Sequence, residues 1–258
     1  MIRVDHVSKD FRSDFLRRRR TVVRELSFEM RPGETFALLG ANGAGKTTTM
    51  KMILDLIRPD TGSITIGGID SRDPMARSAL GYLPEQPYFS PHLTGFELIR
   101  YYGALAGVSR EIREERARNL IRSLGLQGAE NRRIRHYSKG MMQRLGFAQV
   151  LISDPSVLVL DEPMSGLDPV GRKEIRDVLL AQKEKGKTIL LSSHILEDVE
   201  RICDRAGFLV EGRMEEIVET MPAPLPQRRR DDAPRSVPSL ERLFVEHVHS
   251  RYKEKIAE

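Results

Sequence analysis

The run Gly-Ala-Asn-Gly-Ala-Gly-Lys-Thr at residues 40–47 constrains the fold more than any other part of this sequence. It has the spacing G-x-x-x-x-G-K-S/T, in which glycines let backbone N–H groups converge on phosphate oxygens. Residues 35–39 (TFALL) predict a short buried strand before it, and residues 48–56 predict a helix after it. A helix that begins at such a loop directs its positive end at an anion. The run therefore predicts a nucleoside triphosphate site, with Lys46 at the terminal phosphates and Thr47 on Mg²⁺.

An acidic pair follows a buried strand in the second half of the chain. Residues 157–160 (VLVL) form an uninterrupted apolar run, as in a strand buried on both faces of a parallel sheet, and Asp161 and Glu162 come directly after it. Ligands of α/β sheets bind at the carboxyl ends of the strands. Asp161 is suited to holding Mg²⁺ through water, and Glu162 to polarising an attacking water. Beside a phosphate loop, the pair favours a catalytic site over two solvated loop charges.

Two further polar residues each have a structural and a functional interpretation. Ser138 has the features of an N-cap, and a capped core helix explains this segment as well as a binding role does. Residues 188–193 (TILLSS) predict another strand, which ends at His194. A histidine at a strand end is more often structural, but beside a catalytic strand His194 could reach a γ-phosphate.

Together these motifs resemble those of the ATP-binding cassette ATPases, the nucleotide-binding subunits of ABC transporters. The resemblance extends to about residue 215, and the motifs occur in the family's order. The matching segments are the Walker A loop (residues 40–47), the signature position (residues 138–141, SKGM, where LSGGQ is usual), Walker B with the catalytic glutamate (Asp161 and Glu162), the D-loop (residues 165–168, SGLD) and the switch histidine (His194).

The resemblance implies three groups of site residues. Those expected at ATP are Phe11, Gly40, Asn42, Gly43, Ala44, Gly45, Lys46, Thr47, Thr48, Glu85, Gln86, Ser138, Gly140 and Asp168. Those expected at Mg²⁺ are Thr47, Asp161, Glu85 and Gln86. Those expected to act in hydrolysis are Glu162, His194 and Lys46. Phe11 resembles the aromatic residue that stacks on adenine, although Phe15 is close enough in sequence to compete for this role.

Two positions depart from the family's pattern. In the signature, Lys139 replaces the first glycine and Met141 replaces the glutamine, whereas Gly140 keeps the second glycine. Where the usual loop glutamine is expected stands Glu85, with Gln86 next, so either residue can approach Mg²⁺ and the attacking water. Both departures are similar to those of export-type cassettes that serve drugs, polysaccharides or lipids.

The motifs and the resemblance predict an α/β fold. We expect a P-loop NTPase core with a mainly parallel sheet, an N-terminal antiparallel β region and an inserted α-helical subdomain at about residues 88–145. The ATPase domain is expected at residues 1–220. Residues 221–238 hold five prolines and predict an extended linker, and residues 239–258 predict an amphipathic C-terminal helix.

Two helical segments are predicted in more detail. The first covers residues 95–126, and the second covers residues 172–185 and is closed by Gly186. In the first segment the apolar residues expected to face inward are Ile112, Leu120, Ile121 and Leu124.

Composition favours a soluble intracellular protein. The 258 residues are 40% hydrophobic and 31% charged, and no apolar run approaches the ~20 residues of a membrane span. The polar start indicates no signal peptide. The single cysteine, Cys203, excludes an internal disulfide and agrees with a reducing cytoplasm. Nothing in the sequence resembles a Cys/His metal cluster.

The net charge of +5 is modest, and a basic run at residues 17–20 between two predicted strands accounts for part of it. A solvated hairpin tip explains this run most simply, and attraction to anionic headgroups of a cytoplasmic leaflet is the alternative. The absence of tryptophan and of an interleaved basic and aromatic groove speaks against nucleic acid as a partner.

The resemblance also implies partners. One chain carries one phosphate loop and one signature, so a second copy or a paralogous cassette is expected to complete each site head to tail. Separate transmembrane permease subunits are expected as well, with this chain bound peripherally at the cytoplasmic face of the inner membrane. A soluble ABC-type regulator of translation or DNA repair is the first alternative. A scaffold with little turnover is the second, and the presence of Lys46, Asp161, Glu162 and His194 argues against it.

Overall fold

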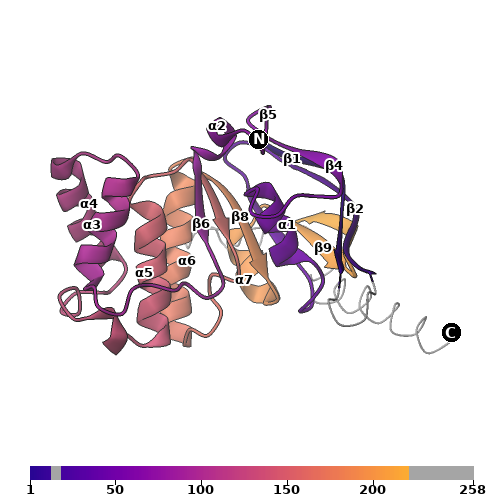
Figure 1. The fold of residues 1–258 in the computed structure, drawn as a ribbon. Coiled ribbons are helices and arrows are strands. Elements are labelled where there is room, and N and C mark those ends of the chain that lie inside the picture. Colours follow the sequence, from indigo (N-terminus) through magenta and orange to yellow (C-terminus); the bar gives the residue numbers. More distant parts are fainter. Residues whose placement is uncertain (13–18, 221–258) are drawn as a thin grey trace. The chain divides into compact units, whose positions relative to one another are not determined.

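A computed structural model describes residues 1–12 and 19–220 (Figure 1). The predicted linker and C-terminal helix lie outside these residues, as does Phe15. The chain divides into two compact units. Of the described residues, the first unit contains 1–12, 19–30, 35–76 and 192–220, and the second contains Arg31–Glu34 and Arg77–Leu191. No helix within the described ranges is long and apolar enough to cross a membrane.

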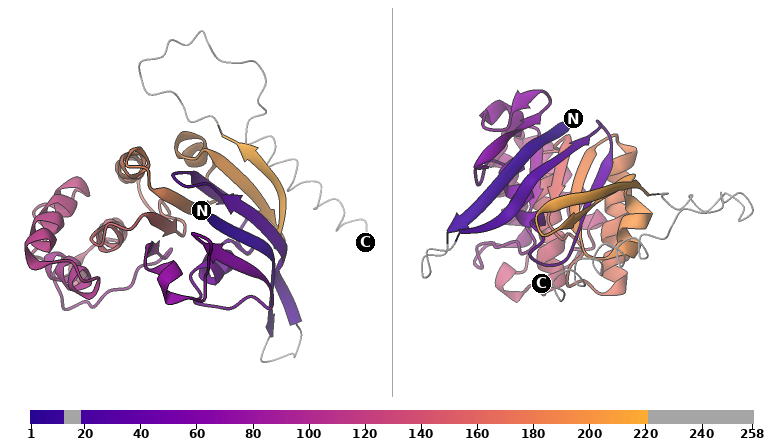
Figure 2. Two further views of the ribbon diagram at one scale, coloured as in Figure 1. Left: turned by 90° about the horizontal axis from the view of Figure 1, so that it is seen from above. Right: turned by 90° about the vertical axis from the view of Figure 1, so that its right-hand side faces the viewer.

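The first unit contains the antiparallel β region that the sequence predicts. Its four strands lie in the order β2-β1-β4-β5. Their bounds are β1 (Ile2–Arg12), β2 (Arg19–Met30), β4 (Thr61–Ile66) and β5 (Ile69–Asp70). β1 pairs with β2 and with β4, and Figure 2 shows β1 and β2 running side by side. Ile2, Val4 and Phe28 are buried, so one face of this sheet forms part of the unit's core.

Three more strands belong to the first unit, and the first of them leads directly into the phosphate loop. β3 (Thr35–Leu39) is buried over its whole length and pairs in parallel with β9 (Arg205–Val210), which pairs antiparallel with β10 (Arg213–Glu219). Helix α1 (Lys46–Ile53) contacts β2 and β4, and α7 (Leu196–Ile202) contacts β3. Helix α1 begins two residues earlier than the sequence predicted and ends at Ile53.

The second unit contains a parallel sheet flanked by helices. The central strand β7 (Val157–Leu160) pairs in parallel with β6 (Leu80–Leu83) and with β8 (Thr188–Ser193), whose residues up to Leu191 belong to this unit. The parallel pairs of both units agree with the predicted mainly parallel core. The short helix α2 (Pro74–Arg77) stands where the chain passes from the first unit to the second.

The helices of the second unit confirm most of the predicted helical positions. They are α3 (Gly95–Leu105), α4 (Arg110–Ser123), the 3₁₀ turn η1 (Ile134–His136), α5 (Lys139–Leu151) and α6 (Pro169–Glu184). Helices α3, α4 and α5 pack against one another (Figure 1). The predicted segment 95–126 is two helices, because Gly107 adopts φ 73° and breaks it. The inward orientation predicted for Ile112 is wrong, since this side chain is 50% exposed, whereas Ile121 and Leu124 are buried.

Candidate nucleotide-binding site

The phosphate loop connects β3 to α1 in the first unit. Gly45, at the N-cap of α1, has φ 106°, a conformation that glycine adopts far more readily than other residues. A Cβ at this position would also lie 2.9 Å from the carbonyl oxygen of Val22. The Thr49 N–H donates to the Gly45 carbonyl at 2.9 Å and so starts the helix. The backbone conformation of Gly45 therefore sets the path of the loop, and the first turn of α1 begins directly after it.

Lys46 supplies the positive charge of this loop. Its side chain is buried, and its Nζ donates to the Gly40 carbonyl at 2.7 Å and to the Ala41 carbonyl at 3.3 Å. The first turn of α1 contains no acidic residue, so the positive potential at its N-terminus is not compensated locally. Thr47 is half-buried in the same turn. The Lys46 ammonium, the N-terminus of α1 and the Thr47 hydroxyl are together suited to bind a polyphosphate with its Mg²⁺.

Phe11 lies in the same unit, near the C-terminal end of β1, and is 40% exposed. It pairs in register with Arg20 on β2, and the Lys9 ammonium lies 5.8 Å from the centroid of its ring. A half-exposed ring on a fixed strand can accept a flat base on its free face.

His194 also belongs to this unit. It follows β8 directly with an exposed side chain and lies within a turn in which the Ile195 N–H donates to Ser193 Oγ at 2.9 Å.

The acidic pair lies in the second unit, directly after β7. Asp161 and Glu162 are 1% and 8% exposed, and the Asp161 N–H donates to the Leu83 carbonyl at 2.8 Å. Glu162 has φ 47°, a conformation costly for a residue with a Cβ and frequent at functional sites. Burial raises the pKa of Tyr82 to about 12, and the charge of Asp161 adds to the rise. The pair thus places two buried carboxyl groups directly after the carboxyl end of β7.

Glu85 and Gln86 come after Leu83, which is the register partner of Leu160 at the end of β7. Both side chains are exposed. The loop that carries them therefore starts beside the end of β7, where Asp161 follows.

The start of α5 carries the residues at the expected signature position. Ser138 is the N-cap, as its sequence pattern predicts, and its Oγ accepts from the Met141 N–H at 3.3 Å. A Cβ on Gly140 would meet Leu167 at 3.5 Å, an ordinary contact. Asp168 is the N-cap of α6 and accepts from the Gly171 N–H at 2.8 Å.

Two residues of α5 that the sequence did not assign to the site contact the segment after Glu162. Gln143 is buried, and its Nε2 donates to the Pro163 carbonyl at 3.0 Å. The side chain of Lys139 lies along Gly166: its Nζ, Cε and Cδ are 2.6, 2.7 and 3.1 Å from the place of a Cβ. A glutamine among apolar residues of α5 was the available signal for Gln143. The Lys139 contact depends on two segments far apart in sequence, so the sequence held no signal for it.

The structure distributes the predicted site residues between the two units. The first unit holds Phe11, Gly40, Asn42, Gly43, Ala44, Gly45, Lys46, Thr47, Thr48 and His194. The second unit holds Glu85, Gln86, Ser138, Gly140, Asp161, Glu162 and Asp168.

The residues present fit Mg²⁺ as the expected metal. No group of three or more His, Cys, Asp or Glu side chains that could hold a metal occurs within residues 1–12 and 19–220. Mg²⁺ differs from metals that need such a group, because it keeps several waters and is bound through one or two carboxylates and the substrate's phosphates. The hydroxyl of Thr47 and the carboxylate of Asp161 are donors of the required kind.

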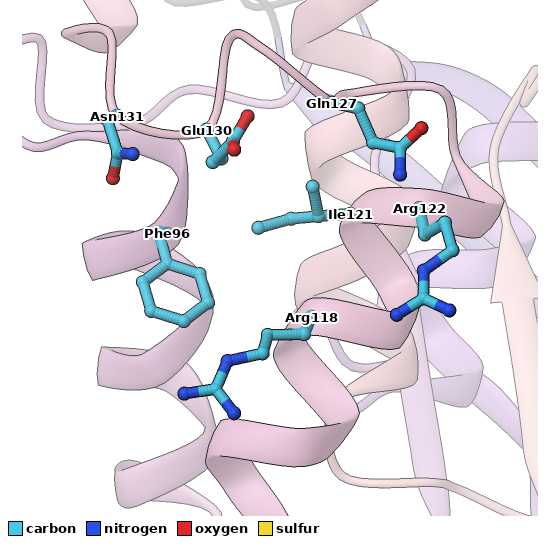
Figure 3. Close-up of a pocket in the computed structure, with 7 residues that line it drawn as sticks. All are labelled: Phe96, Arg118, Ile121, Arg122, Gln127, Glu130 and Asn131. Atoms are coloured by element: carbon cyan, nitrogen blue, oxygen red, sulfur yellow. The ribbon is translucent and has the colours of Figure 1, made fainter.

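The second unit also has a pocket of about 350 Å³ between α3, α4 and the loop after α4 (Figure 3). The Phe96 ring comes from α3, and Arg118, Ile121 and Arg122 come from α4. Gln127, Glu130 and Asn131 complete its lining. No lining residue is among those that the sequence assigns to nucleotide or metal.

The fold and the arrangement of motifs define a P-loop protein of the ATP-binding cassette class. The family model described as ABC transporter matches residues 23–165. The chain is 45% identical over 211 residues to an uncharacterized ABC transporter ATP-binding protein of Synechocystis, covering 81% of this chain and 60% of that protein. It is 40% identical over 194 residues to the Nod factor export ATP-binding protein I of Burkholderia lata, covering 74% and 64%. The chain therefore belongs to the ABC transporter family, among its ATP-binding subunits.

Solved structures agree with this assignment. A structure described as the ATP binding subunit of an ABC transporter superposes with a TM-score of 0.79 at 33% identity, covering 95% of this chain and 98% of that one. A dimeric ATP-binding cassette bound to ADP and Pi shares the fold, with a TM-score of 0.77 at 22% identity and coverage of 85% and 99%. The chain spans less than two thirds of the length of the curated relatives named above.

Proposed function

We propose that this protein binds and hydrolyses ATP and thereby drives translocation by separate membrane subunits of an ABC transporter. The observation that carries the proposal is the buried Asp161-Glu162 pair at the carboxyl end of β7. Burying two carboxyl groups at the end of a strand costs free energy, so a purely structural role does not explain the pair. In a chain that also carries a complete phosphate loop, such a pair has the chemistry that phosphoryl transfer to water requires.

In the proposed mechanism the first unit binds the nucleotide. Phe11 stacks on adenine, the loop N–H groups hold the phosphate oxygens, and Lys46 neutralises the β- and γ-phosphates. His194 donates a hydrogen bond to the γ-phosphate. Thr47 and Asp161 would hold Mg²⁺, which supplies further charge neutralisation on the phosphates when bound.

The second unit supplies the residues that act on the attacking water. Glu162 accepts a hydrogen bond from this water and orients it toward the γ-phosphorus, and Glu85 or Gln86 assists at the metal and the water. Catalysis then consists of positioning and electrostatic stabilisation, with no covalent intermediate.

We further propose that two cassettes, either two copies or this chain and a paralogue, enclose two ATP molecules head to tail. Ser138 and Gly140 of one cassette would then face the γ-phosphate bound by the other. The exposure of Ser138 and Lys139 at the start of α5 supports this assignment, since an anion can approach that end of the helix. Closure and reopening of the pair would move the membrane subunits at the cytoplasmic face of the inner membrane. Export is the proposed direction, because relatives of 35% and 40% identity are named for linearmycin resistance and Nod factor export.

The Glu162→Gln variant tests the hydrolytic role. The amide keeps the shape of the side chain but polarises water poorly, so kcat should fall by roughly 10²–10³ while ATP affinity is retained. The variant should also accumulate as an ATP-bound dimer. Phosphate release and calorimetric ATP binding are the measurements, and Glu184→Gln, at an exposed position of α6, is the matched control. Turnover near that of the wild type would remove Glu162 from catalysis and favour a different water-activating residue.

A further inference from the structure

One member of the arginine run at residues 17–20 lies beside the phosphate loop. A guanidinium nitrogen of Arg20 is 4.0 Å from the place that a Cβ on Gly43 would occupy. It is the one described atom within 4 Å of that place that belongs neither to Gly43 nor to its chain neighbours. Gly43 is exposed and has φ 83°. The open side of a phosphate-loop glycine therefore faces a cation.

The register of the antiparallel sheet places the same arginine beside the expected adenine contact. Arg20 on β2 pairs directly with Phe11 on β1. Side chains of such cross-strand pairs have Cβ atoms roughly 4.5–5.5 Å apart. Arg20 thus neighbours both the ring expected at the base and the glycine expected at the phosphates. A nucleotide bound between these two residues passes the guanidinium group.

The charge of Arg20 is available for a ligand. Its side chain makes no hydrogen bond or ion pair with any other residue in the described ranges 1–12 and 19–220. Its neighbour Arg19 is different. Backbone and side-chain hydrogen bonds from Asp10 and Lys9 lower the pKa of Asp60, and the charge of Arg19 contributes to this lowering. The side chains of successive residues in a strand point to opposite faces of the sheet, so Arg19 and Arg20 have different neighbours.

We propose that Arg20 is an additional nucleotide-binding residue, whose guanidinium contacts a phosphate oxygen of bound ATP beside Gly43. The proposal rests on the nucleotide site proposed above and adds to it a cation from the strand opposite the adenine contact. Arginine suits this role because it stays charged at any physiological pH and its donors match phosphate oxygens in geometry. At least this member of the basic run then serves the nucleotide rather than solvent or lipid.

The test uses the full chain with Arg20→Gln, and Arg19→Gln as the matched control. The ligands are MgATP and inorganic tripolyphosphate, each in competition with a fluorescent ATP analogue. Arg20→Gln should weaken both ligands about 3- to 10-fold, a range set by a charge-assisted hydrogen bond at an exposed position. Arg19→Gln should bind as the wild type does. Phe11→Ala should weaken ATP but not tripolyphosphate, which has no base to stack. The loss in Arg20→Gln should shrink at high salt.

Three outcomes would overturn the proposal. One is wild-type affinity of Arg20→Gln for both ligands. The second is an equal loss in Arg19→Gln, which would mean a general effect of net charge. The third is normal nucleotide affinity combined with lost binding to phosphatidylglycerol vesicles, which would assign Arg20 to lipid headgroups. Lys46→Ala separates this inference from the nucleotide site itself: if it too leaves ATP affinity unchanged, the site fails, and if it alone weakens ATP, only the role of Arg20 fails.

Discussion

At the scale of single residues, backbone conformation decides which amino acids the candidate site tolerates. Gly45 combines φ 106° with the close approach of the Val22 carbonyl, so a side chain there meets two obstacles. Gly67 has φ 62° but nothing within 4 Å of a Cβ, so a side chain there meets only one. Comparing substitutions at Gly45 and Gly67 therefore distinguishes the effect of a steric collision from the effect of backbone strain.

Gly45→Ala should therefore lower the free energy of unfolding more than Gly67→Ala does, and it should also abolish ATP binding. Left-handed strain alone costs about 1 kcal/mol or somewhat more, and the collision adds to it. Urea denaturation and calorimetric ATP binding measure both effects. Equal destabilisation by the two changes would mean that the Val22 carbonyl moves aside easily.

Phe11→Ala should weaken ATP binding by about 1–3 kcal/mol, the range measured for other aromatic side chains stacked on bases. Phe15→Ala is the comparison, since Phe15 competes for the same role in the sequence. The measurement is ATP affinity by calorimetry. Loss of affinity in Phe15→Ala alone would show that Phe11 is not the adenine contact.

At the scale of elements, helix α5 is tied to the segment that follows the acidic pair. Gln143 donates to the Pro163 carbonyl, and Lys139 lies along Gly166. Both contacts are made from the first two turns of α5 to residues directly after Glu162. Helix α5 can thus fix the backbone next to Glu162, the residue that we propose orients the attacking water.

Gln143→Leu should reduce kcat for ATP hydrolysis several-fold while leaving ATP affinity nearly unchanged. The substitution keeps the volume but removes the donor to Pro163, at a cost of about 1–2 kcal/mol in stability. Gln127→Leu, at an exposed position, is the control. Steady-state kinetics and urea denaturation check the prediction, and a pure loss of stability with normal kcat would limit Gln143 to a structural role.

An ion pair between a buried lysine and a largely exposed aspartate joins two further elements of the second unit. Lys187 before β8 donates to Asp154 before β7, and the Lys187 side chain is 8% exposed. This hydrogen bond lowers the pKa of Asp154 below its model-compound value of 3.8. Because the folded-state pKa is depressed, the pair adds stability above about pH 4 and loses it as pH falls further.

Asp154→Asn should destabilise the protein by about 1–2 kcal/mol at pH 7, a modest value because the Asp154 carboxylate is itself largely exposed. The variant should also lack the part of the acid-induced loss of stability that belongs to this pair. Urea denaturation at pH 7 and in steps below pH 4 measures both effects. Parallel curves for wild type and variant over the acid range would contradict the assignment.

At the scale of the whole molecule, the residues expected at one ATP belong to different units and, by our proposal, to different copies. Lys46 belongs to the first unit, and Gly140 at the start of α5 belongs to the second. Two defective variants can therefore complement each other only if each supplies what the other lacks.

Gly140→Asp should retain ATP binding by the monomer but lose ATP-induced dimerisation and cooperative hydrolysis. A carboxylate at the start of α5 repels a γ-phosphate, while the fold tolerates the Cβ because it meets Leu167 at 3.5 Å. Mixing with Lys46→Ala protein should restore part of the hydrolysis, since one site of a mixed dimer has both an intact loop and an intact signature. Light scattering and phosphate release check this, with Gly140→Ala as the control. Normal hydrolysis by Gly140→Asp alone would exclude assembly in trans.

The sequence by itself determined the class of fold and the main chemistry. The phosphate loop, the buried run before Asp161 and the N-cap Ser138 are local patterns, in which spacing alone fixes backbone conformation or burial. Such patterns needed no knowledge of distant residues. They were least reliable at the ends of helices, as the early start of α1 and the break at Gly107 show.

Tertiary structure decided everything that depends on residues far apart in the chain. The position of Arg20 near Gly43, the hydrogen bond from Gln143 to Pro163 and the exposure of Ile112 follow from how strands and helices pack, and periodicity does not encode them. The same holds for the arginine run: its composition indicated a charged tip, but only the strand register and the path of the phosphate loop set one arginine beside a glycine expected to hold phosphate.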